Sequence, residues 1–209
     1  MLKGFVAGLA VVNAYEWFAH KYLLHGVHRK GKPRFSPTPK QMESHWAHHR
    51  EVRKQDFSDD CYVEGLDSWR TRNEIMSLAV VATVLSAAAY PFSKGMALSF
   101  WYCAGNYYYV HRRSHLEPEW AKKRIPWHYD HHMNSNQDAN WCVTRPWFDY
   151  VMGTRMVSSA DLKEANPLGL PLPAPLSKAL TQAIESVFPA KWVEQKPCLL
   201  YTSPSPRDS

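Results

Sequence analysis

The chemistry of this sequence is concentrated in its histidines, of which ten out of eleven fall into four regularly spaced groups. Two groups are pairs and two follow the pattern HxxHH. They are His20 and His25; His45, His48 and His49; His111 and His115; and His128, His131 and His132. Residues three and four apart share a helical face, so each HxxHH presents three imidazoles in one direction. Neutral imidazole binds iron, zinc and copper, and the set therefore predicts a site for two transition-metal ions.

Other site chemistries have less support in the sequence. The four cysteines form no CxxC pair, which argues against a disulfide framework, a zinc ribbon or an iron–sulfur cluster. The segment HREVRK at 49–54 does not contain the HExxH pattern of zinc proteases. Asp59 and Asp60 are adjacent carboxylates in a charged loop, where we expect both to be solvated. His28 belongs to none of the four groups, and we expect it to be an ordinary surface or core residue.

Three apolar stretches adjoin the histidine groups and are candidates for membrane helices. Residues 4–15, 75–93 and 95–110 contain no charged residue, and the first stretch stays largely apolar to Leu24. A membrane span needs about 20 residues, so each helix must extend beyond its uncharged stretch. The sequence PFSKG at 91–95 predicts a turn that joins the last two stretches into a helical hairpin. The alternatives are an N-terminal signal peptide, with VNA at 12–14 as its cleavage site, or buried helices of a soluble protein.

The placement of charge predicts the membrane orientation. The chain has a formal net charge of +6 and a pI near 9.1, and its basic residues gather next to the histidine groups. By the positive-inside tendency, these groups lie on the cytoplasmic side. This placement explains the basic pI without a nucleic-acid partner, and no aromatic–basic RNA-binding motif is present. The mean hydropathy of −0.45 is compatible with a few spans that carry a large polar region.

These patterns predict an all-α fold, an integral-membrane helical bundle with a cytoplasmic histidine-rich helical cap. NPLGLPLPAP at 166–175 is too rich in proline for a regular helix. Residues 176–188 predict an amphipathic helix that lies on the membrane or on the core. We expect one domain over residues 1–197. Residues 198–208 read like a translated sequencing adaptor, so 198–209 are expected not to be native; a disordered Ser/Pro tail is the alternative.

The order HxxxxH, HxxHH, HxxxH, HxxHH resembles the fatty acid hydroxylase/sterol desaturase superfamily of membrane-bound non-haem di-iron oxygenases. The resemblance covers residues 16–155, which we take as the core motif region. NWCVTRPWFDYVMGTR at 140–155 is similar to the segment that follows the last histidine triplet in that family. Four histidine motifs in this order are specific for the superfamily and much less specific for a substrate.

The resemblance implies that the ten grouped histidines ligate two iron ions, with O2 as co-substrate. It implies attack on a C–H bond of a fatty acyl chain that enters from the bilayer. Carotenoid ring hydroxylation and sterol methyl oxidation are alternatives within the same class. A non-catalytic zinc-binding membrane protein is the alternative from a different class.

Electrons must come from a separate protein, cytochrome b5-like or ferredoxin-like, because the sequence shows no flavin, haem or iron–sulfur motif. Arg50, Arg53 and Lys54 are candidates to dock such an acidic carrier, or else they face lipid headgroups.

Four polar residues are candidates to accept the second ring N–H of a ligand histidine and so to fix its orientation. Glu16 precedes the first histidine pair by one helical turn, and Asp130 and Asp138 flank His131. Asn140 is expected to play a similar role. Each is otherwise an ordinary polar residue.

Aromatic residues make up 13% of the chain, a proportion typical of proteins at a membrane interface. Several lie near the predicted interface, where we expect either an aromatic belt or the lining of a slot for a lipid chain. They are Trp17, Tyr22, Trp101 and the three tyrosines at 107–109.

Overall fold

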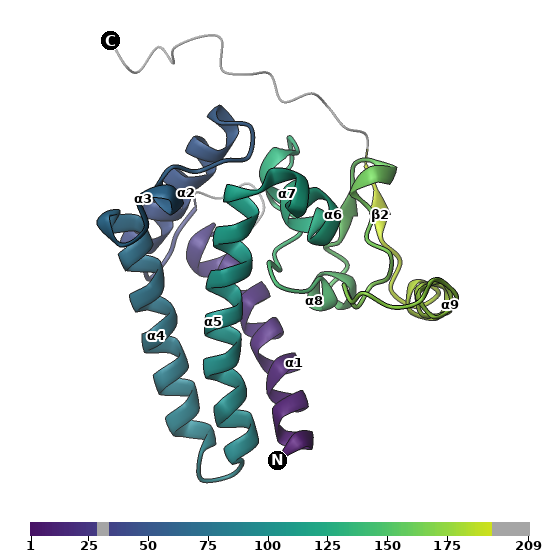
Figure 1. Cartoon of the computed structure of the whole chain (residues 1–209), viewed down its shortest axis with the longest axis horizontal. Coiled ribbons are helices and arrows are strands. Elements are labelled where there is room, and N and C mark those ends of the chain that lie inside the picture. Colours follow the sequence, from purple (N-terminus) through teal and green to yellow (C-terminus); the bar gives the residue numbers. More distant parts are fainter. Residues whose placement is uncertain (29–33, 194–209) are drawn as a thin grey trace.

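Helices dominate the computed structural model, which describes residues 1–28 and 34–193 (Figure 1). They account for 66% of the residues and strands for 2%, which confirms the all-α prediction. Residues 198–209, which we expected not to be native, lie outside the described residues.

Three long helices run side by side and form a bundle (Figure 1). They are α1 (Leu2–Phe18), α4 (Trp69–Ala89) and α5 (Lys94–Leu116). The α4–α5 hairpin forms where the sequence predicted a turn, and the Ser93 hydroxyl accepts a hydrogen bond from the Met96 N–H to cap α5. Helices α1 and α5 can pack closely because Gly8 has no side chain. A Cβ atom at this position would lie only 1.8 Å from the Ser99 Oγ. Such small-residue contacts are common between membrane helices.

One helix among residues 1–28 and 34–193, α4, is long and apolar enough to cross a membrane. The predicted spans at 4–24 and 95–110 are helical as well, but α1 has only 17 residues, and α5, although 23 residues long, is not apolar enough to meet the same criteria. Large apolar side chains on all three helices point outward and are exposed. They include Val6, Val11, Met76, Val80, Val84, Leu98, Trp101 and Tyr102.

Shorter elements form a cap at one end of the bundle (Figure 1). The helices are α2 (Pro39–Lys54), α3 (Cys61–Glu64), α6 (Pro118–Arg124), α7 (Pro126–Met133), α8 (Trp147–Val151) and α9 (Ala174–Glu185). Proline stands at the first position of α2, α6 and α7, where its missing N–H leaves no bond unmade. The amphipathic helix begins at Ala174 rather than Leu176 and ends at Glu185. Two strands that the sequence did not predict, β1 (Met156–Val157) and β2 (Lys191–Trp192), pair in parallel.

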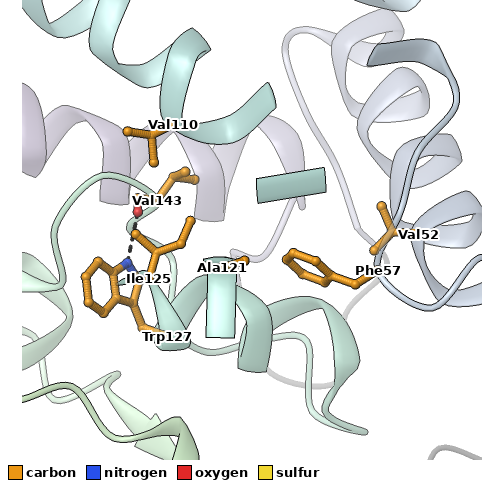
Figure 2. Packing of buried hydrophobic residues seen from close by; sticks show 7 residues of the cluster. All are labelled: Val52, Phe57, Val110, Ala121, Ile125, Trp127 and Val143. Atoms are coloured by element: carbon orange, nitrogen blue, oxygen red, sulfur yellow. Dashed lines mark hydrogen bonds between the residues drawn. The ribbon is translucent and has the colours of Figure 1, made fainter. Parts of the chain in front are cut away.

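The core of the cap joins the two helices that carry the histidine triplets (Figure 2). Its buried residues come from the end of α2 and the turn that follows it, from α5, and from the segment 121–143, which contains α7. They are Val52, Phe57, Val110, Ala121, Ile125, Trp127 and Val143. The indole N–H of Trp127 donates to the Val143 carbonyl oxygen at 2.9 Å. Close packing of this kind fixes α2 and α7 relative to each other and to α5.

Candidate metal centre

All ten grouped histidines are buried, and they gather into two clusters at the junction of the bundle and the cap. Cluster A consists of His20, His25, His45, His49 and His131. Cluster B contains His48, His111, His115 and His132. Within each of these groups the potential ligand nitrogens lie within 4.8 Å of one another. We include His128 in cluster B, because its Nε2 lies 3.3 Å from the Nε2 of His115.

Each HxxHH triplet is divided between the two clusters in a reciprocal way. Helix α2 gives its first and last histidines to cluster A and its middle one, His48, to cluster B. Helix α7 does the opposite and gives only its middle one, His131, to cluster A. The three imidazoles fan out across about 100° of the helix surface, enough to reach two neighbouring sites. The triplets therefore serve as bridges between two sites rather than as one site each.

The first histidine pair reaches cluster A because the end of the first long helix is wound as a π-helix, η1 (Ala19–Leu24). Its i→i+5 hydrogen bonding places His25 above His20, with the His25 N–H donating to the His20 carbonyl at 2.9 Å. The ring centroids of the two are 5.0 Å apart. Residues five apart diverge by about 140° on an ideal α-helix, so the π-helical turn is what lets this pair converge. Gly26, with φ of 65°, then turns the chain away.

Five histidines are held by a hydrogen bond to Nδ1. Each acceptor is a carbonyl or carboxylate oxygen, so Nδ1 carries the proton and Nε2 keeps a free lone pair toward the cluster. The pairs are His20 with Trp141 O (2.5 Å), His131 with Ala139 O (2.7 Å), His115 with Phe57 O (2.8 Å), His48 with Asp59 Oδ2 (2.6 Å) and His111 with Glu74 Oε1 (2.7 Å).

The crowding of nitrogens in cluster A fits a bound cation. The Nε2 of His49 lies 3.1–3.2 Å from the Nε2 atoms of His25, His45 and His131. One ring proton can satisfy at most one of these contacts. Nitrogen ligands at ~2.1 Å from one metal ion lie roughly 3 Å or slightly more from one another. The spacing therefore suits ligands of a shared metal ion better than hydrogen bonds among imidazoles.

Cluster B also fits a bound cation, because several of its ring nitrogens are buried without a hydrogen-bond partner among the described residues. The Nε2 atoms of His48 and His111, the Nδ1 of His128 and both ring nitrogens of His132 have no hydrogen-bond partner among the described residues. Buried polar atoms are rarely left unpaired, because their desolvation costs about 1–3 kcal/mol each. A metal ion would satisfy those of them that point into the cluster.

The histidines of α2 and α7 are neutral and available as ligands. Burial lowers the pKa of His45, His49 and His132 well below the ordinary value of 6.5, and the neighbouring imidazoles add to this shift. Burial also lowers the pKa of His131 to about 3. Metal ions bind the deprotonated ring nitrogen, so this environment favours metal over proton.

Asp59 is a site residue for which the sequence prediction was wrong. Instead of being solvated, it is 1% exposed and accepts hydrogen bonds from His48 Nδ1 at 2.6 Å and from Arg70 Nη2 at 2.8 Å. The chain reverses after α2 through positive φ angles at Asp56 and Phe57, and this turn brings Asp59 back to the helix. Burial opposes ionisation, but these partners lower the pKa of Asp59 to about 2. Asp60 is exposed, as expected.

Glu74, which the sequence analysis missed, plays the corresponding role on α4. Its carboxylate accepts from His111 Nδ1 at 2.7 Å and from the Tyr62 hydroxyl at 2.7 Å. The signal that could have revealed it is its position. A carboxylate at the head of a 19-residue uncharged stretch needs a partner, because an unpaired charge there is costly.

Glu16 accepts no hydrogen bond from a histidine ring among the described residues, contrary to expectation. Its carboxylate accepts from the N–H groups of Val143 and Thr144, at 2.5 and 2.7 Å, and from the Thr144 hydroxyl at 2.8 Å. Asp149 likewise accepts the N–H of Trp141 at 2.8 Å. The two acids fix the backbone of the 140–155 segment, and the Trp141 carbonyl there receives the His20 ring N–H.

The other three candidates also differ from the prediction in part. Asp130 accepts from the N–H and hydroxyl of Ser158, and the side-chain oxygen of Asn140 accepts from Arg155 and the Met156 N–H. Neither accepts a bond from a histidine ring in the described hydrogen bonds. Asp138 lies 3.7 Å from the Nδ1 of His25 rather than beside His131, and it is paired with Arg34.

An apolar cavity of about 570 Å³ leads from the bundle to both clusters. Side chains of α1, α4 and α5 line most of it, and four histidines close it, two from each cluster. These are His20, His45, His48 and His111. Among the aromatic residues expected there, Tyr107 lines the cavity, whereas Trp17 packs against Trp141 and Trp101 is exposed.

The basic residues near the site divide into structural and exposed ones. Arg53 donates to the backbone carbonyls of His132 and Asn134 and so ties α2 to the end of α7. Arg50 and Lys54 are exposed. His28 is also exposed and lies outside both clusters; its Nε2 is 2.8 Å from the Phe35 carbonyl oxygen.

We expect Asp59→Asn to weaken metal binding by about 10- to 100-fold, because the amide no longer secures the His48 tautomer and leaves Arg70 without its carboxylate. Competition with a graded series of chelators, followed by metal analysis, measures the change. Asp60→Asn is the matched control, since Asp60 is exposed and contacts no histidine in the described hydrogen bonds. Equal chelator resistance in Asp59→Asn and the unaltered protein would show that Asp59 does not support the site.

The arrangement is a buried pair of imidazole clusters at the end of an apolar cavity. Five neutral nitrogen ligands leave a bound transition-metal ion with most of its charge, and the cavity gives an apolar molecule access to both sites. Comparisons of the chain with protein-family models, curated proteins and solved structures find no match.

Proposed function

We propose that this protein is a membrane-bound non-haem di-iron oxygenase that hydroxylates a C–H bond of a fatty acyl chain. It uses O2 and electrons from a separate donor protein. The observation that carries the proposal is the apolar cavity that ends on histidines of both clusters. A purely structural metal site needs no such opening, whereas a catalytic site needs a path for its substrate.

The metal pair and the protein have separate tasks in this proposal. When bound, two reduced iron ions supply the O2 chemistry that amino-acid side chains lack. The ten histidines hold the metals, and Asp59 and Glu74 keep the ring protons of His48 and His111 on Nδ1. The cavity walls orient the acyl chain and exclude water from the reacting carbon.

The shape of the cavity favours an extended substrate. Phe100 and His111 both line it, and their separation of 11 positions on α5 corresponds to roughly 16 Å along the helix axis. The lining of the bundle portion includes Val12, Val81 and Leu85, which offer no polar partner to a bound chain. The exposed apolar residues of α1, α4 and α5, together with the apolar length of α4, support entry of the substrate from a bilayer.

Expression in a lipid-producing host, followed by untargeted lipid mass spectrometry, tests this function. We expect acyl lipids heavier by one oxygen, the added atom coming from ¹⁸O2 when this gas is supplied. Metal analysis of anaerobically purified protein should give about two iron ions per chain. A carotenoid or sterol product would retain the reaction class and replace the substrate. Two zinc ions per chain, with no oxygenated product after iron reconstitution, would refute the oxygenase function.

A further inference from the structure

Helix α9 turns its polar face toward the protein. Ser177, Thr181 and Glu185 lie four residues apart and therefore on one face. The Ser177 hydroxyl accepts from the Asn166 amide at 3.1 Å, and the Thr181 hydroxyl, which donates to the Ser177 carbonyl at 2.9 Å within the helix, lies 3.4 Å from the Ala165 carbonyl oxygen. Glu185 forms an ion pair with the Lys163 ammonium group. These contacts dock α9 on the cap, and the side chains of Leu180 and Ile184 are half-buried beside them.

The apolar face of α9 points away from the protein. Leu176, Ala179 and Ala183 are exposed, and the stripe continues past the helix end to Val187. Leu176 is 49% and Val187 66% exposed. A surface helix in water normally buries its apolar stripe. On α9, Leu180 and Ile184 are half-buried, whereas the stripe from Leu176 to Val187 is not covered by residues 1–28 or 34–193.

The position of α9 fits a bilayer surface as that cover. In Figure 1, α9 is seen nearly end-on, whereas α1, α4 and α5 run in the plane of the view, so α9 lies across the bundle axis. Along that axis it stands beside α8 and level with the upper part of α1, on the bundle side of the cap. An interfacial amphipathic helix has this orientation, parallel to the membrane plane where spanning helices emerge.

Aromatic side chains near the end of the helix agree with this setting. Phe188 follows α9 directly and is 39% exposed, and Trp192 on β2 is 61% exposed. Exposed aromatic rings are enriched at the level of the lipid headgroups. The small residues Ala179 and Ala183 leave the stripe shallow, which suits fluid lipid better than an interlocking protein surface with large anchor residues.

We infer that α9 lies in the membrane interface, with its apolar stripe covered by lipid acyl chains and its polar face docked on the cap. The inference rests on the membrane placement in the proposed function and not on the metals or the reaction. The interfacial helix holds the cap, through the Glu185–Lys163 ion pair, against the same membrane surface from which the bundle emerges.

Fluorescence quenching of the full chain in phosphatidylcholine nanodiscs tests the inference. A polarity-sensitive fluorophore is attached at Ala183→Cys on the stripe or at Lys178→Cys on an exposed polar side, with Cys103 and Cys198 changed to serine. We expect nitroxide-labelled lipid to quench the probe at 183 at least about twofold more than the probe at 178. Aqueous iodide should show the reverse order. The helical circular dichroism of each labelled protein checks that it is folded.

Two results would overturn the inference. Equal quenching by iodide at both positions would place the stripe in water, and protection of 183 from both quenchers would mean that a second protein copy covers it. The quenching measurement uses neither iron nor product, so its result is independent of the test of the oxygenase function. Lipid quenching at 183 without any oxygenated product would refute the oxygenase proposal alone, and product formation with a water-exposed stripe would refute only the role of α9.

Discussion

Replacing His48 with alanine is expected to abolish hydroxylated product and to lower the metal content from about two ions per chain to about one or fewer. The Nε2 of His48 is buried and has no hydrogen-bond partner in the part of the chain that the structure describes, while its Nδ1 is held by Asp59. His48 also lines the cavity, so the variant loses a ligand at the point where the substrate arrives. Loss of a direct ligand should exceed the 10- to 100-fold effects typical of the residues behind the ligands, so we expect activity to fall by more than roughly 100-fold.

The matched control is His28→Ala. Of the eleven histidines, His28 alone belongs to none of the four groups. It is exposed and lies in neither cluster. Product yield, iron content and membrane recovery are measured for both variants. We expect His28→Ala to retain all three, and His48→Ala to retain membrane recovery alone. Full turnover by His48→Ala would remove His48 from the ligand set.

Filling the cavity should stop the reaction without disturbing the metals. Ala104 lines the cavity on α5, between Phe100 and Tyr107. Ala104→Trp would place an indole ring where the acyl chain passes, while both histidine clusters stay intact. Because small displacements from the reactive geometry cost about 100-fold in rate, we expect at least that loss of hydroxylation with about two metal ions retained.

Gly105→Trp provides the control for a bulky residue on α5. Gly105 is exposed, and a Cβ atom there would meet nothing within 4 Å, so its indole would point outward from the bundle. Product analysis and metal content are compared between the two tryptophan variants. Unchanged hydroxylation in Ala104→Trp, or an equal loss in both variants, would show that the cavity is not the path of the substrate.

The sequence predicted the helical class, the α4–α5 hairpin and the histidine set, because each depends on local patterns. Charge-free stretches define the long helices, and the HxxHH spacing places three imidazoles on one helical face. The division of the triplets between two clusters was not predicted. Spacing shows which direction side chains point, but the partner in that direction depends on how α2, α5 and α7 pack.

The acidic residues around the clusters show the same limit. Glu16 and Asp130 are close to histidines in sequence but bond to Thr144 and Ser158, which lie far along the chain. Asp59, which sequence position left in a loop, reaches His48 because the chain reverses after α2. The predicted membrane bundle is confirmed only in part. The three long helices form as predicted, and α4 is apolar enough to span a membrane. The placement of the bundle in a membrane belongs to the proposal.

The reciprocal sharing of the triplets makes the two metal sites thermodynamically dependent on each other. Helices α2 and α7 each supply histidines to both clusters, so an ion held in cluster A would restrict the side chains of both triplets and pre-arrange cluster B. The entropy of ordering them is then lost once rather than twice, and the second ion binds more tightly than the first. Chains with a single metal ion should accordingly be scarce, so that the protein exists mainly as an empty or a fully loaded species.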